Sequence, residues 1–329
     1  MRASFNIYGL RLEVVADHPT LFEVFVKDLR AFQRPHRART RGALRLTLTA
    51  LPDGQSGMGH PVPRGPDHEI HEIGHRSRWL ARRVDGTRYG RFGILVSHDV
   101  QRRHIRAQVI PDPLFVPDPM YHYGFTHPVG LWLKRRGMFF LHAGCVAEGG
   151  RGILLAGHPG AGKSTLTLSA VRAGFAALGD EQPLLTQRRG ALEVLAFPRR
   201  IRINRTDAMR FPELHALAAR APWERVIFSL EEVWPGRLAD RCEPRLLIFP
   251  RFRTHGSLRL TRLDGAQALA RLLQDEHFFW YQHPPWRRIS VAHLKLFESL
   301  VRRAPAYHLD YGARDIDKVP DRLRRLLHA

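Results

Sequence analysis

Residues 153–174 read ILLAGHPGAGKSTLTLSAVRAG: an apolar run, a glycine-rich turn and a helix-like tail. The turn fits the pattern G-x-x-x-x-G-K-[ST], in which backbone N–H groups close around phosphate oxygens, the lysine reaches the β- and γ-phosphates, and the hydroxyl binds Mg²⁺. We expect a strand to enter the turn and a helix to begin at Lys163, its positive dipole end toward the anion, and to stop at Gly174. This phosphate loop is predicted to bind ATP through Gly157, His158, Pro159, Gly160, Ala161, Gly162, Lys163, Ser164 and Thr165.

A carboxylate pair follows the predicted helix. Residues 175–178, FAAL, form a short apolar strand that should run parallel to residues 153–156, with both carboxyl ends at the same edge of a sheet. Asp180 and Glu181 would then lie beside the phosphates, where two carboxylates are costly unless they bind Mg²⁺ or accept a proton. We predict a catalytic base at Asp180 and a Mg²⁺ ligand at Glu181, beside Ser164. The reverse assignment of the two carboxylates stays open, as does a plain turn or helix cap.

The pairing register of a predicted β-hairpin places a histidine near the phosphate loop. Residues 148–151, EGGR, have turn composition between the predicted strands 139–147 and 152–156. If Ala147 pairs with Gly152, antiparallel register sets His142 opposite Gly157, at the mouth of the phosphate loop. We therefore predict a functional role for His142, although a slip of one residue would turn its side chain to the other face.

Three segments together resemble the catalytic core of a known family: LHA at 141–143, GHPGAGKST at 157–165 and LGDE at 178–181. They are similar to the HPr kinase/phosphorylase-like family of P-loop serine kinases, most of all to its divergent HPr-kinase-related branch, of the lasso-peptide precursor kinase type. PRLLIFPRFR at 244–253 and PAYHLDYGARD at 305–315 resemble later segments of that branch. The resemblance thus covers residues 139–329.

The resemblance implies a mixed α/β P-loop kinase core, related in fold to ATP-dependent phosphoenolpyruvate carboxykinase. It also implies the activity of the kinase family, which transfers the γ-phosphoryl group of ATP to a serine of a protein or peptide. It implies that Asp180 is the catalytic base, that Lys163 and Ser164 contact phosphate and Mg²⁺, and that His142 is the active-site histidine. Two departures argue against HPr itself as the substrate and against the reverse phosphorolysis. Glu181 stands where the carbon-regulation enzymes carry aspartate. The sequence also has no convincing copy of their glycine-containing signature loop, and the nearest segment is IRINRTD at 201–207. A ribosomally made precursor peptide is the favoured substrate.

The charge of +21 fits an acidic peptide and a phosphorylated ligand equally well. Arginine supplies most of the 52 basic residues, without a block of five or six, which argues against nucleic acid as the partner. Arg251 and Arg253 alternate along a predicted strand, so both should point to one face and could hold phosphate or an acidic peptide. The alternative for this pair is a solvated basic face.

Residues 1–138 read as a separate small α+β domain that could bind substrate, and residues 139–329 as the catalytic domain. The patterns predict a strand at 10–17, a helix at 20–32, a strand at 43–51, a turn at Asp85-Gly86 and a helix within 121–136. The segment 111–119 reads as a linker. Apolar runs stay shorter than the roughly 18 residues of a membrane span, and a signal core is not apparent, so we expect a cytoplasmic protein without a membrane partner. Self-association is left open.

The sequence is also compatible with other functions. The alternatives to a peptide kinase are a P-loop kinase of a small-molecule hydroxyl and a non-catalytic, ATP-dependent peptide-binding module. The strand-like LLIFP at 246–250 ends in proline rather than in a Walker-B aspartate, which argues against an ATPase motor. HEIGH at 71–75 matches the zinc-protease pattern H-E-x-x-H, but that pattern works only on a helix, and here it contains a glycine and follows a proline-rich loop.

Overall fold

The structure, a computed structural model, describes residues 1–34, 43–50, 68–72, 77–82, 84–89, 94–99, 102–109, 127–197, 201–221, 224–254, 257–275 and 287–329. The chain divides into two compact units, Met1–Leu133 and Lys134–Ala329. Within the described ranges, helices that are long and apolar enough to cross a membrane are absent.

The first unit is built on a nine-stranded sheet in the order β3-β1-β2-β4-β9-β8-β7-β6-β5. The pairs β2–β4 and β4–β9 are parallel, and the other neighbours are antiparallel. Its elements are β1 (Arg2–Ile7), β2 (Leu10–Ala16), α1 (Pro19–Asp28), β3 (Gln33–Arg34), β4 (Leu44–Ala50), β5 (His68–Glu72), β6 (Ser77–Arg82), β7 (Val84–Tyr89), β8 (Ile94–Asp99), β9 (His104–Val109) and α2 (His127–Lys134), which ends one residue into the second unit.

Most of the expected elements of this unit are present. Alternating apolar residues bury one face of β2 and β4, as the patterns predict. The expected helix 20–32 ends at Asp28 and is followed by a 3₁₀ turn at Arg30–Phe32. The expected turn at Asp85-Gly86 is wrong: Gly86 lies inside β7 and pairs with Leu80 and Ser97 on the two neighbouring strands. The linker 111–119 lies outside the described residues, as does the part of the helix within 121–136 that precedes His127.

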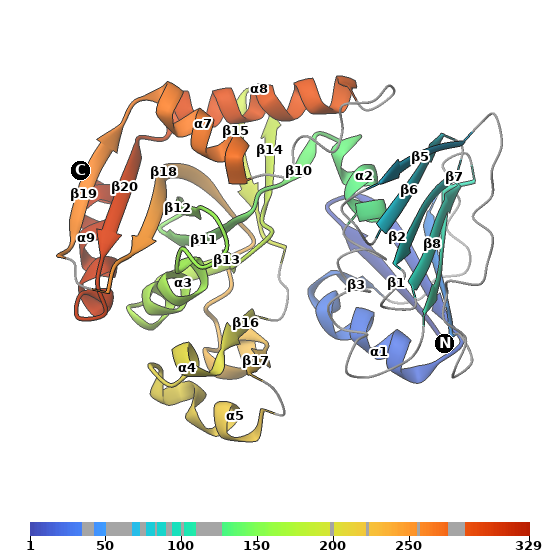
Figure 1. Cartoon of the computed structure of the whole chain (residues 1–329), viewed down its shortest axis with the longest axis horizontal. Coiled ribbons are helices and arrows are strands. Elements are labelled where there is room, and N and C mark those ends of the chain that lie inside the picture. The colour runs from blue at the N-terminus through green and yellow to red at the C-terminus, as the bar shows by residue number, and fades with distance from the viewer. Residues whose placement is uncertain are drawn as a thin grey trace. The chain divides into compact units, whose positions relative to one another are not determined.

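The second unit is mixed α/β, as expected from its sequence. Its main sheet runs β10-β14-β15-β18-β12-β11-β13, and β20 continues it from β18 to β19 (Figure 1). The strands are β10 (Met138–Phe140), β11 (Ala143–Glu148), β12 (Arg151–Ala156), β13 (Ala176–Gly179), β14 (Leu184–Arg188), β15 (Ala191–Leu195), β18 (Arg241–Phe252), β19 (Arg259–Leu263) and β20 (Ala306–Tyr311). The pairs β12–β18 and β18–β20 are parallel.

Two hydrophobic cores cover the two faces of this sheet. One contains α3 (Lys163–Arg172) and α9 (Val319–His328), together with a small subdomain; the other contains α7 (Gly265–Asp275) and α8 (Arg287–Arg303). Figure 1 shows α3 and α7–α8 on opposite sides of the strands. The subdomain comprises β16 (Ile201–Asn204), α4 (Arg205–Ala208), α5 (His215–Arg220), β17 (Arg225–Phe228) and α6 (Leu230–Val233).

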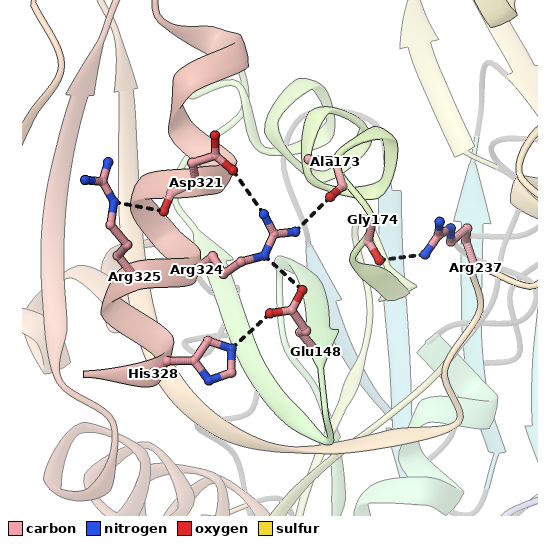
Figure 2. Close-up of polar contacts among 8 residues, drawn as sticks. All are labelled: Glu148, Ala173, Gly174, Arg237, Asp321, Arg324, Arg325 and His328. Carbon is pink, nitrogen blue, oxygen red and sulfur yellow. Dashed lines mark hydrogen bonds and ion pairs between the residues drawn. The ribbon is translucent and has the colours of Figure 1, made fainter.

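The helix that follows the phosphate loop is fixed at its far end. Gly174 ends α3 with a positive φ of 106°, as expected, and Arg237 Nη1 donates to its carbonyl at 2.7 Å. Arg324 of α9 donates to the Ala173 carbonyl at 2.8 Å and to Glu148 at 2.9 Å (Figure 2). Cations at a helix C-terminus complement its negative dipole end. These contacts tie α3 to α9 and to the β11–β12 hairpin.

Both cysteines are buried and free. The sulfur atoms of Cys145 and Cys242 lie 3.7 Å apart, beside Gly152 of β12. Burial raises the pKa of the Cys145 thiol. A side chain at residue 152 would collide with the Cys242 sulfur, so this glycine permits the packing of the three strands.

Candidate active site

The phosphate loop connects β12 to α3, as the sequence predicts. Gly157, Gly160 and Gly162 have positive φ values of 149°, 85° and 89°, a conformation that favours glycine. His158, Pro159 and Gly160 are exposed at the tip, whereas Lys163 is buried. The Lys163 ammonium folds back over the loop and donates to the Gly157 carbonyl at 2.5 Å and to the His158 carbonyl at 3.2 Å. The first N–H groups of α3 therefore lie beside a cation, which is a setting for anions.

Two neighbouring strands support the loop from below. Pro250 of β18 lies against Gly157, within 3.9 Å of where a side chain there would begin. Tyr311 of β20 is buried, and its hydroxyl lies 3.5 Å from the Ala161 carbonyl. A side chain at Gly162 would collide with that hydroxyl. Burial, with a further contribution from Asp207, raises the pKa of Tyr311 and so keeps the phenol neutral.

Strand directions place the predicted residues at one edge of the sheet. β12, β18 and β20 are parallel, and β13 shares their direction because β11 is antiparallel to both β12 and β13. The carboxyl ends of these four strands, together with the beginning of β11, form what we call the carboxyl edge. Along the strand order it carries Tyr311, Arg251, the phosphate loop, His142 and Asp180. The expected common edge is present, but β11 lies between the two strands that the sequence predicts as parallel.

The hairpin register is confirmed. Ala147 pairs with Gly152, and the ladder continues to Ala143 opposite Ala156, so His142 and Gly157 are the next residues on either strand. The expected single strand 139–147 is wrong, however. The chain bends at residues 141–142, and β10 pairs with β14, in another part of the sheet. His142 is half-buried at this bend.

The carboxylate pair lies directly after β13. Asp180 is buried and 7% exposed, whereas Glu181 is half-buried. The Asp180 backbone carbonyl lies 3.7 Å from where a side chain on Gly144 would begin, and the Thr167 hydroxyl of α3 occupies that same space. Gly144 therefore lets α3 approach β11 closely, which brings the phosphate-loop helix to the strand beside Asp180.

Arg251 and Arg253 share a partner that their own sequence segment does not indicate. Arg251 forms a bidentate pair with Asp310 of β20, at 2.6 and 3.0 Å, and Arg253 donates to the same carboxylate at 3.1 Å. The expectation of a common face is thus confirmed. Hydrogen bonding from Arg251 lowers the pKa of Asp310 well below its usual range. The side chains of both arginines are nearly half exposed. Because one carboxylate is shared between two guanidinium groups, a net positive charge remains at this surface.

Arg251 and Arg253, with their shared partner Asp310, lie on the sheet face that α7 covers. Leu247 and Phe249 of β18 belong to the core with α7, and alternation along the strand gives Arg251 the same face. His308 pairs with Phe249 across the strands and lies 3.5 Å from Asp310. Burial lowers the pKa of His308, and the charges of Arg251 and Arg271 lower it further. The Asp310 carboxylate raises it, but the net shift is downward. A neutral imidazole therefore lies below an exposed, positively charged surface.

Other motifs take structural positions. Glu232 caps α6 through a reciprocal pair of hydrogen bonds with Ser229, and Glu231 accepts a hydrogen bond from the Gly236 N–H. IRINRTD forms β16 and the start of α4. His71 and Glu72 of the zinc-like pattern lie on strand β5, not on a helix, while His75 is outside the described residues.

Mg²⁺ suits the oxygen atoms that this edge offers. Clusters of three or more His, Cys, Asp or Glu side chains that could hold a metal are absent from the described ranges. A magnesium ion bound to nucleotide phosphates needs only one or two protein oxygens, because water and phosphate supply the rest. Ser164 in the first turn of α3 and Glu181 after β13 fit that limited requirement.

Comparisons with known proteins find a likeness among solved structures. The chain matches no family model and no curated protein. Among solved structures it is similar to one described as the Hpr(Ser) kinase/phosphatase from Coxiella burnetii, with 12% sequence identity and a TM-score of 0.31. That match covers 56% of this chain and 93% of the other.

Proposed function

We propose that this protein is an ATP-dependent kinase that transfers the γ-phosphoryl group to a serine hydroxyl of a peptide or small protein. The observation that carries the proposal is the shared edge: a phosphate loop on one strand and a buried aspartate, Asp180, on a strand of the same direction. Phosphoryl transfer depends on positioning and on electrostatic stabilisation more than on covalent chemistry by the protein. An edge that holds the phosphate loop and Asp180 can position the reacting groups and stabilise the charge that develops on the phosphate.

Each residue has a distinct task in this proposal. The loop N–H groups and Lys163 hold the phosphates and offset charge that develops on the γ-phosphoryl oxygens. Asp180 accepts the serine proton as the hydroxyl oxygen forms its bond to phosphorus and the bond to the β-phosphate oxygen breaks. His142, one position beyond the ladder that ends at Ala156, lies between the loop and Asp180 in the strand order and contacts the acceptor. Ser164 and Glu181 hold Mg²⁺, which supplies charge neutralisation when bound.

The arginines favour an acidic polypeptide as the acceptor. Arg251 and Arg253 lie on the sheet face opposite to α3, paired with Asp310, while the loop helix lies on the other face. In this position they are better suited to hold a segment of the acceptor than the triphosphate. A ribosomally made precursor peptide with acidic residues near one serine is the substrate class that we propose.

The decisive experiment is incubation with γ-labelled ATP, Mg²⁺ and a panel of serine peptides of varied charge, with products located by mass spectrometry. Wild type should label peptide serine, and Lys163→Ala should lower the transfer rate by roughly 100-fold or more, because an unpaired phosphate charge raises the barrier. Lys134→Ala, outside the carboxyl edge, is the matched control. Label on a metabolite and on no peptide would favour the small-molecule kinase; binding of ATP and peptide without transfer would favour the binding module.

A further inference from the structure

Phe252 is an exposed aromatic residue at the carboxyl edge. It is the last residue of β18, and 40% of its surface is exposed. Within the described ranges, the other exposed large hydrophobic residues are Met1, Met209, Leu238 and Val291, so Phe252 is the aromatic member of this set. Leaving an aromatic ring in water forgoes free energy that a ligand with an apolar face would recover.

The ring faces the phosphate-loop side of the sheet. Ile248 and Leu246 of β18 belong to the core with α3, and alternation gives Phe252 that face, opposite to Arg251. Phe252 pairs in register with Tyr311, and their ring centroids are 5.7 Å apart at an interplanar angle of 72°. Since the Tyr311 hydroxyl contacts the loop at Ala161 and Gly162, one aromatic ring separates Phe252 from the helix end of the loop.

The backbone on either side of Phe252 is held in place. Arg251 pairs with Asp310 in the parallel ladder, and the Arg253 N–H donates to the Tyr311 carbonyl at 2.9 Å. The side chains of both arginines are tied to Asp310 on the opposite face. The phenylalanine therefore has a fixed backbone and an edge-to-face neighbour, which are the features of a rigid stacking platform.

We propose that Phe252 is the platform on which the base of the bound nucleotide stacks. The inference rests on the proposed function, since the loop must hold the triphosphate. It specifies the ligand further: a nucleoside triphosphate, with purines preferred because their larger rings offer more stacking area. Stacking on an aromatic side chain is tolerant of base identity because every base has a π-face. The site thus distinguishes nucleotide from inorganic polyphosphate.

The test compares Mg·ATP with Mg·tripolyphosphate by isothermal titration calorimetry on the full chain. Replacing a stacking aromatic by alanine should raise the ATP Kd by about 5- to 100-fold in Phe252→Ala and leave the tripolyphosphate Kd within about twofold. Phe252→Trp should restore the wild-type ATP Kd. Met209→Ala, which removes another exposed side chain of the same unit, should change neither ligand's affinity.

The outcomes separate the two proposals. An ATP Kd that is unchanged in Phe252→Ala overturns the platform, as does an equal loss of affinity for both ligands. If wild type binds ATP no more tightly than tripolyphosphate, the platform fails while the phosphate loop stands. If wild type binds neither ligand, the proposed function fails and the platform with it. Indole fluorescence of Phe252→Trp, relative to wild type, should change with ATP and not with tripolyphosphate.

Discussion

The Tyr311 hydroxyl occupies the space that a side chain on Gly162 would need. Gly162 also has a φ of +89°, which disfavours any other residue. We expect Gly162→Ala to destabilise the protein by about 1–3 kcal/mol through overpacking and to raise the ATP Kd by displacing the start of α3. Tyr311→Phe removes only the hydroxyl and should recover part of the loss in the double variant. Thermal unfolding and nucleotide titration of the four proteins measure this coupling, and strictly additive losses would contradict it.

The two carboxylates after β13 should behave differently. Asp180→Asn keeps the shape but removes the base, so we expect Mg·ATP binding within about tenfold of wild type and loss of most turnover. Glu181→Gln, the matched control, should weaken Mg²⁺-dependent ATP binding instead. Equilibrium titration beside single-turnover transfer distinguishes the two effects. Equal losses of binding and turnover in Asp180→Asn would assign that residue to the metal and the base to Glu181.

The arginine pair should act on the acceptor. Replacing Arg251 and Arg253 together by glutamine should raise KM for an acidic peptide by roughly tenfold at low salt, with little effect on kcat, because charge attraction steers encounter. The difference should shrink as salt shortens the Debye length from about 10 Å at 0.1 M to about 3 Å at 1 M. The control double substitution is at two exposed neighbours, Arg188 at the end of β14 and Arg189 in the turn that follows it. A KM that ignores both salt and peptide charge would refute the steering.

Acid should weaken the contact that anchors α9. Glu148 accepts hydrogen bonds from His328 and Arg324, each at 2.9 Å, and these bonds, that of His328 foremost, lower its pKa (Figure 2). A lowered carboxylate pKa contributes stability that is fully present above the ordinary glutamate value of about 4.3 and is lost as the pH falls through the folded-state value. Glu148→Gln should therefore lower the Tm at neutral pH.

The comparison across pH isolates that contact. The Tm difference between wild type and Glu148→Gln should vanish in acid below the folded-state pKa. Asp321→Asn changes another carboxylate on Arg324, but that side chain is 70% exposed and its pair is worth little in water. It should lower the Tm less at every pH. A Tm difference for Glu148→Gln that persists in acid would mean that the carboxylate charge does not stabilise the contact.

The sequence by itself determined the local elements of the proposed site. The glycines of residues 157–162 and the following lysine specify a loop that enters a helix at Lys163, because only glycine adopts the required positive φ without strain. The turn at residues 149–150 fixed the register of the β11–β12 hairpin and hence the place of His142 relative to Gly157. The carboxylates after β13 followed from a short apolar strand behind a crossover helix. Each of these inferences depends on neighbours along the chain.

Long-range pairing decided what the sequence could not. A bend at residues 141–142 sends β10 to a different part of the sheet, and Gly86 lies within a strand because two neighbouring strands pair with it, which outweighs the local turn preference. Asp310 meets Arg251 across 59 residues because parallel β18 and β20 share a register. Tyr311 reaches Gly162 for the same reason. Which strands become parallel neighbours depends on how whole helices and strands pack to bury their apolar faces. The sequence of a single segment therefore does not predict its parallel partner.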